Sequence, residues 1–101
     1  MVKRTAKLQN LLEKVKKSLE SGDYHYTGHA EERLQQREVT RLEVKQVLKS
    51  GHHEKSKDKF DEEFDEWNYS IKGKTVDKRN LRVIISFDKG MLIITVIDLD
   101  K

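Results

Sequence analysis

Apolar residues recur at helical spacing in the first half of the chain and at strand spacing in the second half. Near the N-terminus they follow the spacing of one face of an amphipathic helix. These positions are Leu8, Leu11, Leu12, Val15 and Leu19. Thr5 can cap the start of this helix, and Gly22 can end it. The pattern predicts a basic helix within residues 1–22.

Two further helices are predicted over residues 27–50, after the short link "DYHYT". Thr27 can cap the first of them, and Ala30 and Leu34 are its apolar contacts. Thr40 and Glu43 have the spacing of a capping box, which predicts that the second helix begins there. Its apolar face and its end are given by Val44, Val47, Leu48 and Gly51.

After Gly51 the apolar positions alternate with polar ones, which predicts antiparallel strands over residues 52–99. "HHEKSKDKFDEEF" is expected to form a strand and a charged turn. "EWNYSIKGK" and "NLRVIISFD" alternate, whereas "MLIITVIDL" is apolar on both faces, as in a central strand. Asp88, Lys89 and Gly90 predict a tight turn before this last strand. We therefore expect an α+β fold in a single domain, 1–101, with N-terminal helices packed on one face of a small antiparallel sheet.

Composition limits the possible chemistry. The 101 residues include no cysteine, which excludes disulfides, thiolate zinc sites and cysteine nucleophiles. The N-terminus lacks the apolar region of a signal peptide, and the longest apolar run, "MLIITVI", is too short to cross a bilayer. These features predict a soluble, cytoplasmic protein with no membrane partner.

The net charge of +3 is unevenly distributed. Residues 1–22 carry six Lys or Arg against Glu13 and Glu20, whereas residues 58–66 carry six acids against one lysine. Each segment could bind a partner, or both could be ordinary solvated faces.

One candidate site is a polar stripe on the predicted helix after Thr27. His29, Arg33 and Arg37 are four residues apart and so project from nearly one side. A histidine can titrate near neutral pH, and arginines can clamp phosphate with paired N–H donors. The stripe would suit a phosphodiester substrate, or it is the polar side of an amphipathic helix.

A second candidate lies on the polar side of the predicted sheet. Strand parity places Asn68, Ser70, Lys72, Lys74, Arg82 and Ser86 there. With helices on the other face, these side chains could bind phosphate and position a ribose 2′-hydroxyl, although one polar face is normal for such a sheet. Arg82 is unusual because its strand is otherwise strongly apolar, so it needs a partner or a role.

A metal site is not expected. His52 and His53 are adjacent and would point to opposite faces of a strand, and Glu54 completes no known ligand spacing. Glycine-rich phosphate loops and nucleophile elbows are also absent. No cofactor is predicted.

The segments "YTGHAEERLQQREVTRLEVKQVLKSGHHE", "RNLRVIISFD" and "MLIITVIDL" resemble domain-of-unknown-function family 4258. The resemblance covers roughly residues 24–99 and includes a His-Ala-x-x-Arg helix at His29, Ala30 and Arg33. This family is grouped by fold with RelE-like and MqsR-like bacterial toxins. Many relatives in that group cleave mRNA without metal by activating the 2′-hydroxyl. The resemblance therefore implies a RelE-like fold and a possible toxin–antitoxin role.

Two hypotheses follow. In the first, the protein is a metal-independent, toxin-type endoribonuclease with RNA or the ribosome, and an antitoxin, as partners. Its catalytic residues would be His29, Arg33 and Arg82, and its substrate-binding residues Arg37, Lys72 and Lys74. In the second, the same fold is a non-catalytic RNA- or protein-binding domain. The first requires His29 and Arg82 to lie close together, whereas pairing of Arg82 with Glu32 or Glu38 would make it an internal brace.

Overall fold

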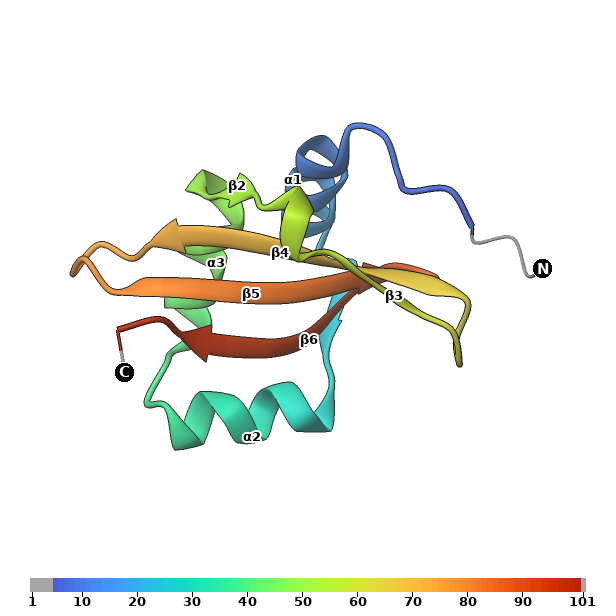
Figure 1. Cartoon of the computed structure of the whole chain (residues 1–101). Coiled ribbons are helices and arrows are strands. Elements are labelled where there is room, and N and C mark those ends of the chain that lie inside the picture. Colours follow the sequence, from blue (N-terminus) through green and yellow to red (C-terminus); the bar gives the residue numbers. More distant parts are fainter. Residues whose placement is uncertain (1–4, 101) are drawn as a thin grey trace.

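The structure is a computed structural model that describes residues 5–100 and confirms an α+β fold. The helices are α1 (Leu11–Ser21), α2 (Gly28–Gln36) and α3 (Arg41–Ser50), with a short 3-10 helix, η1 (Lys55–Lys57). The strands are β1 (Tyr24–Tyr26), β2 (His52–His53), β3 (Lys59–Asp61), β4 (Glu66–Lys74), β5 (Asn80–Phe87) and β6 (Met91–Asp98). Figure 1 shows α1 and α3 behind the sheet and α2 along its edge beside β6.

The sheet is mixed, which corrects the prediction of a purely antiparallel one. Its order is β1-β6-β5-β4-β2, and β3 also pairs with β4. All pairs are antiparallel except that of β1 with β6, which is parallel. The segment read as a link, Tyr24–Tyr26, is therefore an edge strand that places the start of α2 next to β6.

The core lies between the helices and the sheet. It contains Leu11, Val15 and Leu19 of α1, the predicted apolar contacts of α2 and α3, and the alternating apolar positions of β4 and β5. Leu12, which was predicted on the same face of α1, is instead 42% exposed. Its largest fully buried side chains include Ile71, Leu81, Ile85, Met91 and Ile93. Helix α3 begins with the predicted capping box, and the Thr27 side chain accepts a hydrogen bond from the Ala30 N–H, as expected for an N-cap.

Helix α1 begins later than predicted, because residues just before it are held on the sheet. The Leu8 N–H donates to the Tyr69 hydroxyl at 2.8 Å, and the Thr5 hydroxyl donates to the Asp65 carboxylate at 3.2 Å. Thr5 therefore does not cap α1, whose N-cap residue is Asn10. Gly22 ends the helix in a left-handed conformation, as predicted. Residues 1–4 of the predicted basic segment lie outside the described part of the chain.

A β-bulge in β6 shapes the sheet face opposite the helices. Ile84 pairs with Thr95 and Ile85 with Ile93, so Ile94 has no partner in β5. The Ile94 carbonyl instead accepts a hydrogen bond from the Thr27 hydroxyl at 3.1 Å. The apolar side chains of β6 that face away from α1 and α3 are half-buried. They form part of the floor of two surface hollows.

Candidate functional site

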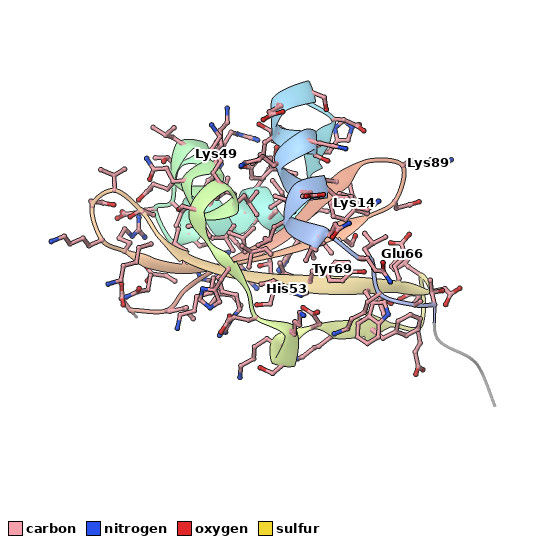
Figure 2. All side chains as sticks on the ribbon, turned by 90° about the horizontal axis from the view of Figure 1, so that it is seen from above. Lys14, Lys49, His53, Glu66, Tyr69 and Lys89 are labelled. Atoms are coloured by element: carbon pink, nitrogen blue, oxygen red, sulfur yellow. The ribbon has the colours of Figure 1, made fainter. Side chains whose placement is uncertain are left out.

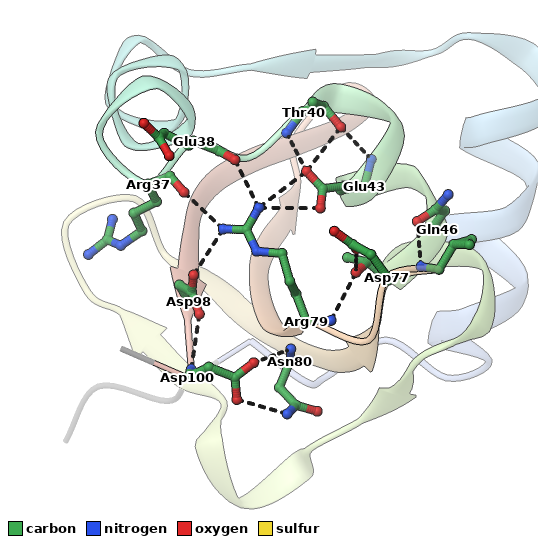
Figure 3. A network of polar contacts seen from close by, with 12 residues as sticks. Arg37, Glu38, Thr40, Glu43, Gln46, Asp77, Arg79, Asn80, Asp98 and Asp100 are labelled. Carbon is green, nitrogen blue, oxygen red and sulfur yellow. Dashed lines mark hydrogen bonds and ion pairs between the residues drawn. The ribbon is translucent and has the colours of Figure 1, made fainter.

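The predicted stripe on α2 lies beside β6. His29 is exposed, and the Arg33 guanidinium donates to the side-chain oxygen of Gln36 on the same helix. Arg37 follows the last residue of α2, and its side chain points away from Arg79 in Figure 3. The Arg37 Nη1 atom is buried without a hydrogen-bond partner among residues 5–100.

The second candidate group lies on the sheet face opposite α1 and α3. Lys72 of β4 and Arg82 of β5 are cross-strand partners, so the structure brings these two cations side by side. Lys74 pairs with Asn80 at the exposed end of the same ladder. No hydrogen bond or ion pair within residues 5–100 joins His29 or Arg33 to Arg82. The stripe on α2 and the cations of β4 and β5 therefore form two separate groups.

Arg82 is paired with Glu54 and with neither Glu32 nor Glu38. The Arg82 Nε atom donates to Glu54 Oε1 at 2.8 Å, and Nη2 donates to Oε2 at 3.4 Å. The hydrogen bond from Arg82 lowers the pKa of the Glu54 carboxyl, although partial burial opposes this effect. Glu54 also accepts a hydrogen bond from the Ser70 hydroxyl. The Glu54 carboxylate therefore holds the Arg82 guanidinium in one orientation.

Arg82 also lines a hollow on this open face, which we call the cationic hollow. Its volume is about 420 Å³, and its lining includes Lys57, Lys59, Asn68, Arg82, Ile84 and Ile97. Lys57 and Lys59 are exposed and belong to η1 and β3, which fold back beside β4. The hollow therefore combines three cationic side chains with an apolar floor, and two of these cations, Lys57 and Lys59, were not predicted as site residues.

The family model of the domain of unknown function DUF4258 matches residues 26–98. The chain belongs to this family. No curated protein and no solved structure matches it. The RelE-like relation thus stays a prediction. The matched range runs from the last residue of β1 to the last residue of β6, so the family's domain includes α2, α3 and the cationic hollow but not α1.

A buried carboxylate of this DUF4258 domain is a feature that the sequence did not reveal. The Asp58 side chain is fully buried and accepts hydrogen bonds from His53 Nε2 at 2.7 Å and from the Ser70 N–H at 2.9 Å. Lys7, which precedes α1, also bonds it at 3.0 Å. His53 packs edge-on against Tyr69, as Figure 2 shows from above. Asp58 thus fastens β2, β4 and the N-terminal segment together.

Arg79 forms the densest polar network of the domain (Figure 3). Its Nη2 atom donates to the carbonyl of Arg37 and to the Asp98 carboxylate, both at 2.9 Å. Its Nη1 atom donates to the Glu38 carbonyl at 2.8 Å and to Glu43. This arginine therefore joins the end of α2, the start of α3 and the end of β6, which is a structural role.

The described residues contain no cluster of three or more metal-ligating side chains. Among the same residues, no helix combines the length and the apolar character needed to cross a membrane. The cationic hollow brings together cations from η1, β3 and β5 and is the strongest candidate for a binding site.

Proposed function

We propose that this protein binds RNA in the cationic hollow and cleaves it without a metal ion, as a toxin-type endoribonuclease. The observation that carries the proposal is the convergence of Lys57, Lys59 and Arg82 around one hollow on the open sheet face. Its volume, about 420 Å³, is in the range of small-ligand sites.

The chemistry of the lining suits a nucleotide unit. Lysine and arginine side chains bind phosphate oxygens, and the Asn68 amide can hydrogen-bond a base or a ribose hydroxyl. Ile84 and Ile97 offer an apolar surface to the face of a base. The cations, the amide and the apolar floor can thus contact the phosphate, the sugar or base edge, and the base face of a single-stranded RNA.

The proposed reaction is attack of a ribose 2′-hydroxyl on the adjacent phosphorus. The new bond joins O2′ to phosphorus, the bond from phosphorus to O5′ breaks, and the products carry a 2′,3′-cyclic phosphate and a 5′-hydroxyl. Arg82, Lys57 and Lys59 would stabilise the negative charge of the transition state. Glu54, which is ionised at neutral pH and contacts Arg82, would accept the 2′-hydroxyl proton. The leaving O5′ would gain a proton from a lysine or from water.

A second candidate function is non-catalytic binding of RNA or protein by the same face. It is favoured by the Arg82–Glu54 pair, because a carboxylate already compensates this guanidinium. If the ligand of the second candidate is RNA, the two candidates make the same prediction for RNA affinity and opposite predictions for cleavage.

The test is incubation of the purified protein with a short, fluorescent single-stranded RNA in the presence of EDTA. We expect fragments that end in a 2′,3′-cyclic phosphate. The double variant Lys57→Ala/Lys59→Ala should lose most of the cleavage activity. The slope of its RNA affinity against salt concentration, both on logarithmic scales, should fall by the amount expected for about two phosphate contacts. Both lysines are exposed, so the variant should fold normally.

The matched control is Lys14→Ala/Lys49→Ala, which removes the same charge from the helical side of the sheet (Figure 2). Its cleavage and binding should equal those of the wild type. Glu54→Gln should bind RNA and fail to cleave it if Glu54 accepts the proton. RNA binding without cleavage by the wild type would support the second candidate, and folded protein that neither binds nor cleaves RNA would overturn both RNA proposals.

A further inference from the structure

A second hollow lies on the same open face and has the opposite charge; we call it the acidic hollow. Its volume is about 270 Å³, and its carboxylates are those of Asp61, Glu66 and Asp88. Leu92 and Ile94 of β6 form part of its apolar lining. The Phe64 side chain, also in the lining, is 66% exposed. The hollow thus presents three negative charges next to an apolar surface.

These three carboxylates form no ion pair with any residue of the described range, 5–100. The Asp61 side chain accepts hydrogen bonds from the backbone N–H groups of Glu63 and Phe64. Within residues 5–100, neither Glu66 nor Asp88 forms an ion pair. Burial, together with the charges of Asp88 and Asp61, raises the pKa of Glu66. Negative charge is therefore crowded here and not neutralised.

Ser86 provides an independent observation. This residue of β5 is only 2% exposed and contributes to the lining of the acidic hollow. Its hydroxyl has no hydrogen-bond partner in the part of the chain that the structure describes. A hydroxyl on an almost fully buried residue that lacks a protein partner can form a hydrogen bond with a group that enters the hollow.

We propose that the acidic hollow binds an arginine side chain of a partner protein, with an apolar neighbouring residue packed against Phe64 and Ile94. A guanidinium is planar and has five N–H donors, so it can bond to more than one carboxylate and to the Ser86 hydroxyl at once. RNA is disfavoured as the occupant because its phosphates would meet three carboxylates. The proposal goes beyond the RNA-binding function and uses a different set of charged residues.

The experiment is a titration of the ¹⁵N-labelled protein with the capped peptide acetyl-Leu-Arg-Leu-amide, followed by NMR. The control peptide contains citrulline, which has nearly the shape of arginine and no charge. We expect the arginine peptide to shift the amide signals of Ser86, Leu92 and Ile94 and to bind at least about tenfold more tightly than the citrulline peptide.

The variant Glu66→Gln/Asp88→Asn should bind the arginine peptide about tenfold more weakly than the wild type. The matched control Glu20→Gln/Glu32→Gln removes two charges from exposed helical positions outside the hollow and should bind like the wild type. Equal binding of both peptides, unchanged binding by the hollow variant, or shifts confined to other amides would overturn the proposal.

Two other occupants are also tested. If a single-stranded RNA shifts the same amides even in the Lys57→Ala/Lys59→Ala variant, in which the adjoining cationic hollow lacks two cations, the occupant is a nucleic acid and the proposal is wrong. If sedimentation shows a dimer that the Glu66→Gln/Asp88→Asn variant cannot form, the occupant is a second copy of this chain and the proposal is again wrong. Loss of RNA cleavage or RNA binding in the lysine variants bears only on the cationic hollow, so the two proposals can fail separately.

Discussion

Arg79 connects more segments than any residue of the candidate site, and its removal should be costly. Its partner Asp98 has a side chain that is only 3% exposed, so loss of the guanidinium would remove an ion pair from a buried carboxylate. We expect Arg79→Met to lower the free energy of unfolding by about 3 kcal/mol. Urea unfolding measures this, with Arg33→Met as the control, because the Arg33 side chain hydrogen-bonds Gln36 of its own helix and no other residue within the range 5–100. A loss below about 1 kcal/mol would contradict the role of Arg79 as an anchor.

The Arg82–Glu54 pair makes a prediction about pH. The pKa of Glu54 in the folded protein is lowered from its ordinary value of 4.5, because Arg82 bonds the ionised form. The pair therefore contributes its full stability above pH 4.5 and loses it as the pH falls through the lowered pKa. Glu54→Gln should cost about 1–3 kcal/mol at pH 7 and progressively less in acid. Unfolding measured across this range checks it, and a cost that does not change with pH would contradict it.

The sequence could indicate that Arg82 needs a partner or a role, but it could not identify Glu54. Strand parity correctly put Lys72 and Arg82 on one face, because that inference needs only the alternation within each strand. The partner depends on how residues 52–61 fold back beside β4. Arg79 was missed for a similar reason: it lies in a turn, and its partners Glu43 and Asp98 are far away in the sequence.

Among the elements, those with strong local signals were predicted well. The capping box of α3 and the N-cap of α2 depend on side chains three residues apart, so the sequence contains the whole motif. Strand β1 has only three residues and pairs with β6, which is about seventy residues away in the chain. Its pairing, and the late start of α1, depend on tertiary contacts that no local pattern contains.

The junction of α3 with β4 depends on Gly51. A Cβ atom there would lie 2.5 Å from the Val47 carbonyl oxygen and 2.6 Å from that of Lys72, both of which are backbone atoms. The φ angle of Gly51 is −75°, so the requirement for glycine is steric and not a left-handed conformation. We expect Gly51→Ala to destabilise the protein by about 1–3 kcal/mol.

Gly28→Ala is the matched control for that variant. A Cβ atom at Gly28 would meet nothing within 4 Å, and the residue lies in the first turn of α2. This variant should be neutral or stabilising by up to about 1 kcal/mol, because alanine loses less conformational freedom on folding. Thermal unfolding of both variants gives the comparison, and equal stability of the two would contradict close packing at Gly51.

At the scale of the whole molecule, the open sheet face combines two hollows of opposite charge. The uneven charge along the sequence predicted an acidic segment, but not that Asp61 and Glu66 would meet Asp88 from the β5–β6 turn. Likewise, Lys57 and Lys59 reach Arg82 only because η1 and β3 fold back beside β4. Both hollows include Asn68, so they adjoin each other. The site is thus a product of the tertiary fold, and this limited its prediction from sequence.

This arrangement also predicts how stability is distributed over the sheet. Strand β5 is hydrogen-bonded to β4 on one side and to β6 on the other, and Leu81, Val83 and Ile85 are fully buried. Strands β2 and β3 have two and three residues and lie at one edge beside β4. Short edge strands open locally, whereas a central buried strand opens only when the whole domain unfolds.

We therefore expect the amide hydrogens in the middle of β5 to exchange with a free energy equal to that of global unfolding, on the order of 5–10 kcal/mol. Amides of β2 and β3 should exchange several kcal/mol more easily, through openings that leave β5 intact. Native-state hydrogen exchange at low urea concentrations measures both. If β3 is as protected as β5, the edge that contributes Lys59 to the cationic hollow is part of the rigid sheet. We expect β3 to be less protected than β5. RNA bound at Lys59 would then oppose the local opening of β3, so RNA should slow the exchange of β3 amides more than that of β5 amides.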